Sequence, residues 1–243
     1  SYSVTGVQTC ALPISNKTRI SDYEKAINDQ SAILMKVHQS NFSIIGFTEE
    51  ASLEEIVTLG KEKGLVSYYD LGSGILNKLN YSKNENTIQE LCQKGLDVIS
   101  FSTDKLIGSI QGGIILAKKE LMQQLKQNQL LRMLRADKVT IAIVEESLKK
   151  YLFGEHNDIL TYKMLNENSK NLQTKAQKLH DLLVAFIQSS VIETTAFVGG
   201  GSMPNEQITS YGVSLKTKNI TNLEKYLRAN NIIARIENEH VIL

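Results

Sequence analysis

The expected fold is decided by residues 65–74, LVSYYDLGSG, an apolar run of strand length that ends in an acid and a glycine-containing turn. Just before it, Ser52-Leu53-Glu54-Glu55 is a capping box, which predicts a helix that begins there and ends at Gly64. A helix, a glycine stop and an apolar strand in direct succession are typical of α/β proteins.

The same alternation continues on both sides of this stretch. Further strands are predicted over residues 32–38, 96–102 and 114–117, and a second capping box, Thr87 to Glu90, opens a helix that Gly95 ends. The strands are apolar runs, which favours a mostly parallel sheet covered by helices on both faces. Ligands of such sheets bind beyond the carboxyl ends of the strands, where His38, Asp70 and the residues after Ser102 fall.

The second half of the chain is organised differently. Helices are predicted from Glu120 to Gln188, with breaks near Gly154 and residues 166–169. A smaller α+β pattern follows, with strands over 191–198, 211–216, 232–236 and 240–243, a loop at 199–202 and a helix capped at Thr221 and ending at Asn230. We therefore expect three segments: a foreign or disordered stretch at 1–15, part of a large α/β catalytic domain at 16–156, and a small α+β domain at 157–243.

Composition excludes several classes of protein. The 243 residues carry 27 Lys and Arg against 26 Asp and Glu, so the net charge of +1 does not favour binding to polyanions through overall charge. The 42% of hydrophobic residues is typical of a globular chain, and no apolar run approaches the ~18 residues that a membrane span needs. Cys10 and Cys92 lack metal-ligand spacing, so no metal site is predicted.

The first fifteen residues differ in character from the rest. Residues 4–14, VTGVQTCALPI, resemble the in-frame translation of a sequencing adapter, and a disordered N-terminal arm is the alternative. On the first interpretation Cys92 is the only native cysteine, which suits a reducing compartment and a cytoplasmic protein. We also expect the native protein to extend upstream of Asn16.

Four residues near predicted strand ends suggest cofactor chemistry. A lysine at position 105 could bond an aldehyde, and Asp70 could hold the proton of a pyridine nitrogen, as pyridoxal phosphate requires. Ser102 could donate to the phosphate of that cofactor, and His38 could stack on its ring. The alternatives from spacing alone are a solvated loop lysine, turn residues at positions 70 and 102, and a structural histidine.

Short motifs in a fixed order strengthen this interpretation. The chain resembles the bacterial L-seryl-tRNA(Sec) selenium transferase family, also called selenocysteine synthase, through KVHQSNF at 36–42, GFTEE at 46–50, DLGSG at 70–74, FSTDKLIG at 101–108, LRMLRADK at 131–138 and VGGGS at 198–202. The resemblance implies a fold-type I pyridoxal-phosphate-dependent transferase that assembles as a homo-oligomeric ring of dimers. At 108–113 the chain reads GSIQGG where the family usually has GGPQAG, and the missing proline is expected to free this loop.

The resemblance also assigns roles to residues. It implies that Lys105 is the catalytic, cofactor-bonding lysine and Asp70 the partner of the pyridine nitrogen. Arg132 and Arg135 match arginines near the selenium donor, and their i, i+3 spacing would place both on one helix face as an anion clamp.

The implied reaction converts seryl-tRNA(Sec) to selenocysteinyl-tRNA(Sec) with selenophosphate, through an aminoacrylate intermediate. The tRNA partner is expected to bind mainly through an N-terminal domain of the family that lies outside this sequence. Two alternatives stay open: a related pyridoxal phosphate lyase that acts on a small amino acid or amino sugar acid, and a non-catalytic fragment.

Overall fold

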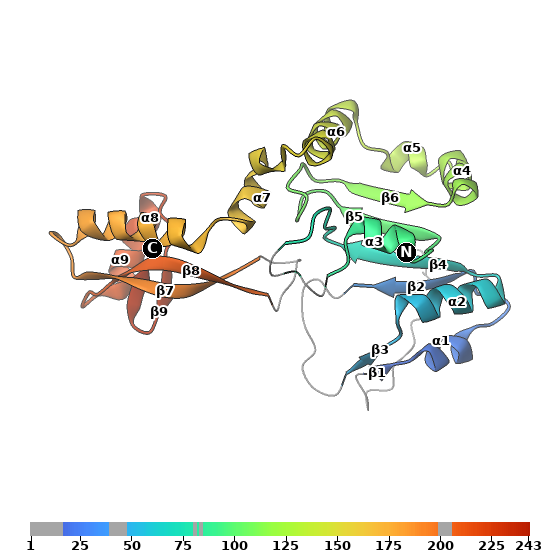
Figure 1. Cartoon of the computed structure of the whole chain (residues 1–243), viewed down its shortest axis with the longest axis horizontal. Coiled ribbons are helices and arrows are strands. Elements are labelled where there is room, and N and C mark those ends of the chain that lie inside the picture. The colour runs from blue at the N-terminus through green and yellow to red at the C-terminus, as the bar shows by residue number, and fades with distance from the viewer. Residues whose placement is uncertain (1–16, 39–47, 80–81, 83–84, 199–205) are drawn as a thin grey trace. The chain divides into compact units, whose positions relative to one another are not determined.

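The computed structural model describes residues 17–38, 48–79, 82, 85–198 and 206–243 (Figure 1). Over these ranges the chain forms two compact units, one up to Lys163 and one from Met164 to Leu243. The division predicted between residues 156 and 157 falls in a short 3-10 helix, η1 (His156–Asp158), within the first unit. Within the described ranges, none of the helices combines the length and the apolar character that crossing a bilayer requires.

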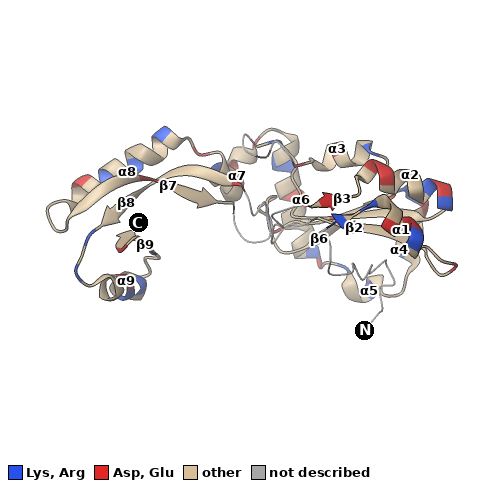
Figure 2. Ribbon diagram, turned by 90° about the horizontal axis from the view of Figure 1, so that it is seen from below, with Lys and Arg blue, Asp and Glu red and all other residues tan. Residues whose placement is uncertain are grey.

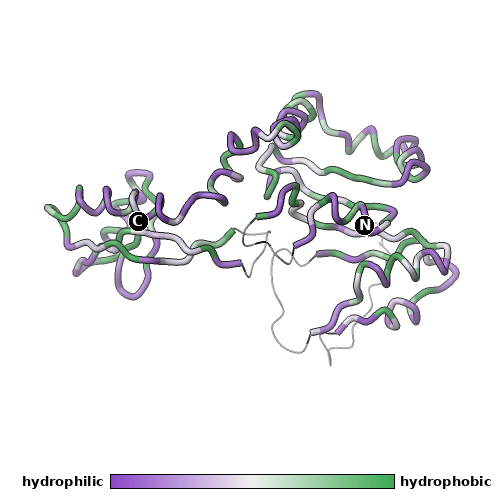
Figure 3. The backbone as a smooth tube through the Cα atoms, viewed as in Figure 1, coloured by the Kyte–Doolittle hydropathy of each residue, from purple (hydrophilic) through white to green (hydrophobic). Residues whose placement is uncertain are grey.

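A four-stranded sheet forms the centre of the first unit. Its order is β2-β4-β5-β6, and its strands are β2 (Ile33–Val37), β4 (Val66–Gly72), β5 (Val98–Ser102) and β6 (Gly113–Ala117). The first three are parallel, and β6 runs antiparallel to β5. These strands lie where the apolar runs predicted them. Figure 3 shows that β6, for example, consists mostly of hydrophobic residues. The prediction of a mostly parallel sheet is therefore confirmed.

Three helices pack on one face of this sheet: α1 (Ile20–Ala26), α2 (Leu53–Lys63) and α3 (Ile88–Gln93). Figure 2 shows α2 and α3 on the same side of the strands. Their apolar side chains meet every second residue of the strands in two clusters, which include Leu34, Tyr69, Leu71, Ile99 and Phe101. Fully enclosed side chains such as Ile56 and Leu91 each stabilise the fold by roughly 1.5–3 kcal/mol relative to exposure.

Both predicted capping boxes are present. Ser52 Oγ accepts a hydrogen bond from Glu55 N at 3.2 Å, and Ser52 N donates to the Glu55 carboxylate at 2.7 Å. Thr87 and Glu90 make the same reciprocal pair at 3.2 and 2.7 Å. Gly64 ends α2 at φ 66°, a left-handed conformation in which a Cβ would be strained. These helix starts and stops are local, which is why the sequence alone predicts them.

The opposite face of the sheet differs from the prediction. Helices were expected on both faces, but in the part of the chain that the structure describes this face carries exposed apolar side chains. Val37 is 55% exposed, Ile115 48% and Ile33 41%. The strands therefore carry apolar side chains on both faces of the sheet, whereas the described helices α1 to α3 cover only one face.

The rest of the first unit is largely helical. It comprises α4 (Lys119–Gln127), α5 (Leu131–Leu134), α6 (Lys138–Leu152), the start of α7 (Leu160–Leu165), and a small parallel pair of strands, β1 (Lys17–Thr18) and β3 (Glu49–Glu50). Asp137 caps α6 by accepting from the amides of Val139 and Thr140. Gly154, at φ 77°, lies at the predicted break after this helix.

The second unit is an antiparallel sheet packed against two helices. Its elements are α8 (Ser169–Leu183), β7 (Ser189–Phe197), β8 (Gln207–Leu215), α9 (Ile220–Ala229), β9 (Arg235–Glu237) and β10 (His240–Ile242), with strand order β7-β8-β10-β9. Val213 and Val241 are completely buried in its core. The expected small α+β fold is therefore present.

The start of α9 corrects one detail of the prediction. Thr221 was expected to cap this helix, but Asn219 does so, with its Oδ1 accepting from Asn222 N at 3.1 Å. Glu224 is then free to pair with Arg228 along the helix instead of closing a capping box. The predicted loop at 199–202 lies outside the described residues.

Candidate active site

The carboxyl edge of the large sheet brings together three of the predicted site residues. Asp70 lies near the end of β4, opposite Ser100 of the adjacent parallel strand β5. Ser102 is the last residue of β5 and lies on the same face as Ser100, because side chains alternate along a strand. Lys105 follows three residues later, in the loop that leads to β6. Asp70 and Lys105 therefore belong to neighbouring strand ends at one edge of the sheet.

Hydrogen bonds hold the Asp70 carboxylate through one of its two oxygens. Its Oδ1 accepts from Gly72 N at 3.2 Å and from Ser100 Oγ at 3.0 Å. The Tyr68 hydroxyl lies 2.8 Å from Ser100 Oγ, and since the serine proton points to Asp70, Tyr68 is the donor to Ser100. Oδ2 has no hydrogen bond within the described ranges. The arrangement thus fixes the carboxylate and leaves one oxygen for a ligand.

Tyr68 and Ser100 were not singled out from the sequence. Each lies two residues before a candidate, Tyr68 before Asp70 and Ser100 before Ser102, so strand alternation places all four on one face. That periodicity was the signal available. The pairing of Asp70 with Ser100, however, depends on the register of β4 against β5, which the sequence does not specify.

Lys105 sits in a compact loop, residues 103–112. Thr103 is fully buried, and its hydroxyl lies 2.6 Å from the Ile110 carbonyl and 3.1 Å from that of Gly112. Backbone bonds from Thr103 N to Gly112 O and from Ser109 N to Thr103 O close the loop. The loop that was expected to be freer is therefore tied internally without the proline. The Lys105 amine has no hydrogen bond or ion pair with any residue that the structure describes.

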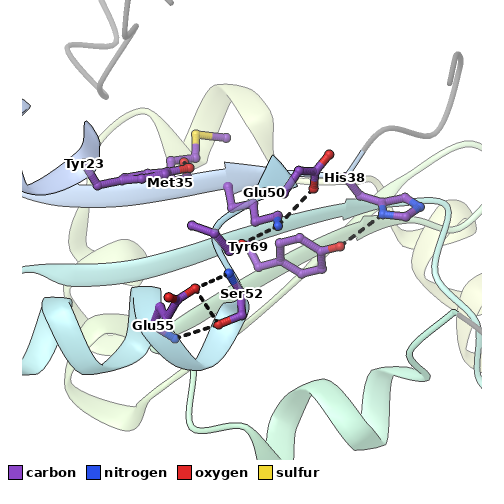
Figure 4. A network of polar contacts seen from close by, with 9 residues as sticks. Tyr23, Met35, His38, Glu50, Ser52, Glu55 and Tyr69 are labelled. Carbon is purple, nitrogen blue, oxygen red and sulfur yellow. Dashed lines mark hydrogen bonds and ion pairs between the residues drawn. The ribbon is translucent and has the colours of Figure 1, made fainter. Parts of the chain in front are cut away.

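His38 is positioned by partners of its own. Its backbone N–H donates to Asp70 O at 2.8 Å, while its ring lies against Tyr69, with Nδ1 3.1 Å from the phenol oxygen (Figure 4). Nε2 lies 3.3 Å from the Glu85 carboxylate. Burial, together with the negative charge of Glu85, raises the pKa of Tyr69 well above its usual value. The phenol therefore keeps its proton, and in the His38 tautomer that carries its hydrogen on Nε2, facing Glu85, Nδ1 accepts a hydrogen bond from the phenol.

The contacts of His38 place its ring near Tyr69, whose side chain points to the helix-covered face. The Asp70 side chain points to the opposite face, because adjacent residues of a strand alternate. Stacking of His38 on a cofactor that Asp70 holds thus stays a prediction.

The two arginines depart from the expected geometry. Arg132 lies inside the four-residue helix α5, but Arg135 is its C-cap, with an extended ψ of 137°. The chain extends there because Asp137, two residues later, begins the separate helix α6. The two arginines therefore do not share a helix face. Both side chains are exposed, and neither has an ion-pair partner among the described residues.

Comparison with known proteins shows the family. Residues 3–243 match the family model described as SelA, L-seryl-tRNA selenium transferase. The chain belongs to this family. The SelA match includes most of the segment predicted to be foreign, whose origin stays a prediction and whose residues lie outside the described ranges.

Two curated SelA relatives, both L-seryl-tRNA(Sec) selenium transferases, show how much of the family the chain represents. The protein of Aliarcobacter butzleri (strain RM4018) is 44% identical over 243 residues, and that of Campylobacter jejuni subsp. jejuni serotype O:6 is 45% identical over 240 residues. Each alignment covers 98% of this chain and 54% of the relative. The chain thus spans about half the length of the curated relatives it matches.

A solved structure shows the fold of this SelA chain. D-Glucosaminate-6-phosphate ammonia-lyase superposes with a TM-score of 0.60 at 16% identity, over 92% of this chain and 54% of that chain. The mixed α/β architecture with a mainly parallel sheet is that of the fold-type I enzymes, so the predicted fold class is confirmed.

Proposed function

We propose that this chain supplies the cofactor-binding core of an enzyme that converts seryl-tRNA(Sec) to selenocysteinyl-tRNA(Sec), with selenophosphate as the selenium donor. Membership of the L-seryl-tRNA selenium transferase family supports the reaction. The observation that carries the proposal is the placement of Asp70 and Lys105 at neighbouring strand ends on one edge of the sheet. Family membership favours this function over a lyase that acts on small molecules.

Family membership and fold both support pyridoxal phosphate as the cofactor, and the residues present fit it. The pyridine nitrogen needs an anionic oxygen to keep its proton, and the aldehyde needs an accessible amine. Asp70 offers Oδ2, which is free among the described residues, and the Lys105 amine is likewise unpaired there. When bound, pyridoxal phosphate acts as an electron sink for the charge left when the α-proton of an amino acid departs.

Each candidate site residue then has a defined role in the reaction. Lys105 would hold the cofactor through its amine and would move a proton at the α-carbon of the amino acid. Asp70 holds the proton on the ring nitrogen, and its Oδ1 contacts keep the carboxylate from turning away. Ser102 donates to the cofactor phosphate. Arg132 and Arg135 hold the anionic selenium donor as exposed cations, one inside α5 and one at its C-cap, and not as a clamp on one helix face.

The partners and the setting are part of the same proposal. Seryl-tRNA(Sec) is the macromolecular substrate, bound mainly by protein outside this chain, and the working enzyme is a homo-oligomeric ring of dimers in the cytoplasm. The names of the curated relatives support the tRNA partner.

The function is tested with the full-length protein, meaning this chain within a polypeptide of its relatives' length. Supplied with seryl-tRNA(Sec) and selenophosphate, it should form selenocysteinyl-tRNA(Sec), and free serine or an amino sugar acid should not replace the seryl-tRNA. Turnover of those small substrates, with none of seryl-tRNA(Sec), would show that the chain belongs to a lyase instead.

A first variant addresses the contacts of Asp70. Ser100→Ala removes the hydroxyl that donates to Oδ1 and leaves the Tyr68 phenol without its acceptor. We expect turnover to fall about two- to tenfold, the effect of losing a hydrogen bond worth ~0.5–1.5 kcal/mol. Tyr68→Phe, which leaves the Ser100–Asp70 bond in place, should cost less. Equal turnover by Ser100→Ala and wild type in a steady-state assay would contradict a role for this chain of hydrogen bonds.

A further inference from the structure

The Lys105 loop is supported from outside by a cluster of aromatic rings. The cluster contains Tyr151 at the end of α6, His156 in η1 and Tyr162 in α7. Tyr151 stacks on His156 with ring centroids 6.0 Å apart and an interplanar angle of 17°, and Tyr162 meets both rings edge-on, at 5.9 and 4.5 Å. The three rings thus brace one another in the last part of the first unit.

This cluster reaches the residues that follow the cofactor lysine. The Tyr151 hydroxyl donates to the carbonyls of Ile107 at 3.2 Å and Leu106 at 3.4 Å. Both of those residues are buried, so the phenol satisfies backbone oxygens that water reaches poorly. Within the described ranges, these two bonds from Tyr151 are the hydrogen bonds that α6 makes to the two residues directly after Lys105.

Gly108 shows how closely the same segment approaches the loop. A Cβ built at Gly108 would lie 2.8 Å from atoms of both Ile159 and Thr161, the residues between η1 and the middle of α7. Gly108 also has φ +71°, which disfavours any side chain there. The loop therefore packs closely against residues 151–162, with no space for a side chain at position 108.

The protonation of the phenol suits this contact. Burial, with a smaller contribution from Tyr162, raises the pKa of Tyr151 to about 12. The hydroxyl thus stays a donor to the two carbonyls throughout the physiological pH range.

We propose that Tyr151 is a positioning residue for Lys105: its hydroxyl fixes the backbone that follows the lysine and so directs the amine toward the cofactor carbonyl. The inference rests on the proposed function, because that function assigns Lys105 its role. Tyr151 itself need not touch substrate or cofactor.

Hydrogen exchange tests whether the hydroxyl holds the loop. In the full-length protein, Tyr151→Phe keeps the ring but removes the donor, and amides of residues 103–112 should exchange about two- to tenfold faster. Tyr23→Phe is the matched control, because Tyr23 donates to the Met35 carbonyl at 3.3 Å, away from the loop. It should leave exchange in residues 103–112 at the wild-type rate. An unchanged loop in Tyr151→Phe, or an equal increase in both variants, overturns the proposal.

A second measurement distinguishes a residue that directs the Lys105 amine from one that only stabilises the loop. After incubation with pyridoxal phosphate and reduction with borohydride, the pyridoxyl label on Lys105 should fall several-fold in Tyr151→Phe relative to Tyr23→Phe. If amide exchange in residues 103–112 is faster in Tyr151→Phe but Lys105 carries as much label as in Tyr23→Phe, Tyr151 does not direct the lysine. If wild type carries its label on another lysine, the proposed function is wrong, while the exchange experiment still decides whether Tyr151 holds the loop.

Discussion

Lys105→Ala should remove the covalent attachment of pyridoxal phosphate and lower turnover of seryl-tRNA(Sec) by at least about 10³-fold. The expectation follows from two tasks that one amine performs, tethering the cofactor and moving a proton at the α-carbon; acid–base catalysis alone contributes ~10²–10⁴-fold. Lys105 is half-buried in a loop closed by Thr103, and its amine has no partner among the described residues, so truncating the side chain should not unfold the sheet edge.

The measurement is peptide mapping of borohydride-reduced protein, together with the turnover assay. Lys126→Ala is the control, because Lys126 is an exposed lysine in the last turn of α4. It should keep both the label and the turnover. Persistence of a stoichiometric label in Lys105→Ala would show that another amine bonds the cofactor.

Asp70→Asn should separate cofactor capture from catalysis. The amide is nearly isosteric, and its oxygen can still accept from Gly72 N and Ser100 Oγ. It carries no charge, however, and cannot hold a proton on the pyridine nitrogen. We therefore expect a turnover loss of about 10²–10⁴-fold, comparable to other acid–base contributions, with the borohydride label on Lys105 largely retained.

A carboxylate at the other edge of the same sheet is the matched control. Asp97 accepts from Ser67 N and Ser67 Oγ at 2.7 Å before the start of β5, and Lys118 pairs with it there. Asp97→Asn should lower thermal stability without a comparable loss of turnover per folded molecule. If Asp70→Asn turns over at the wild-type rate, Asp70 does not contact the ring nitrogen.

The parts of the fold that the sequence predicted correctly are those that depend on near neighbours. Ser52 with Glu55, Thr87 with Glu90, and the stop at Gly64 are satisfied within one helical turn, so their residue types suffice. Parallel pairing of the apolar strands then places Asp70 and Lys105 at the same edge, whatever the details of packing.

What the sequence did not predict depends on distant residues or on where one element ends. The bond from Ser100 to Asp70 joins residues thirty positions apart and needs the register of two strands. The partners of His38, Tyr69 and Glu85, follow from tertiary packing. Arg135 was assigned to a helix face by its spacing, but that helix ends one residue earlier. The sequence could not show that one face of the sheet carries exposed apolar side chains in the described part of the chain, because an apolar run does not indicate what covers it.

The roles of Lys105 and Asp70 in holding the cofactor are tested most directly by an experimental structure of the full-length protein with pyridoxal phosphate bound. We expect a covalent bond from Lys105 Nζ to the cofactor, with the pyridine nitrogen about 2.7–3.2 Å from Asp70 Oδ2. A cofactor bonded to a different lysine, or a ring nitrogen that faces a group other than Asp70, would contradict it.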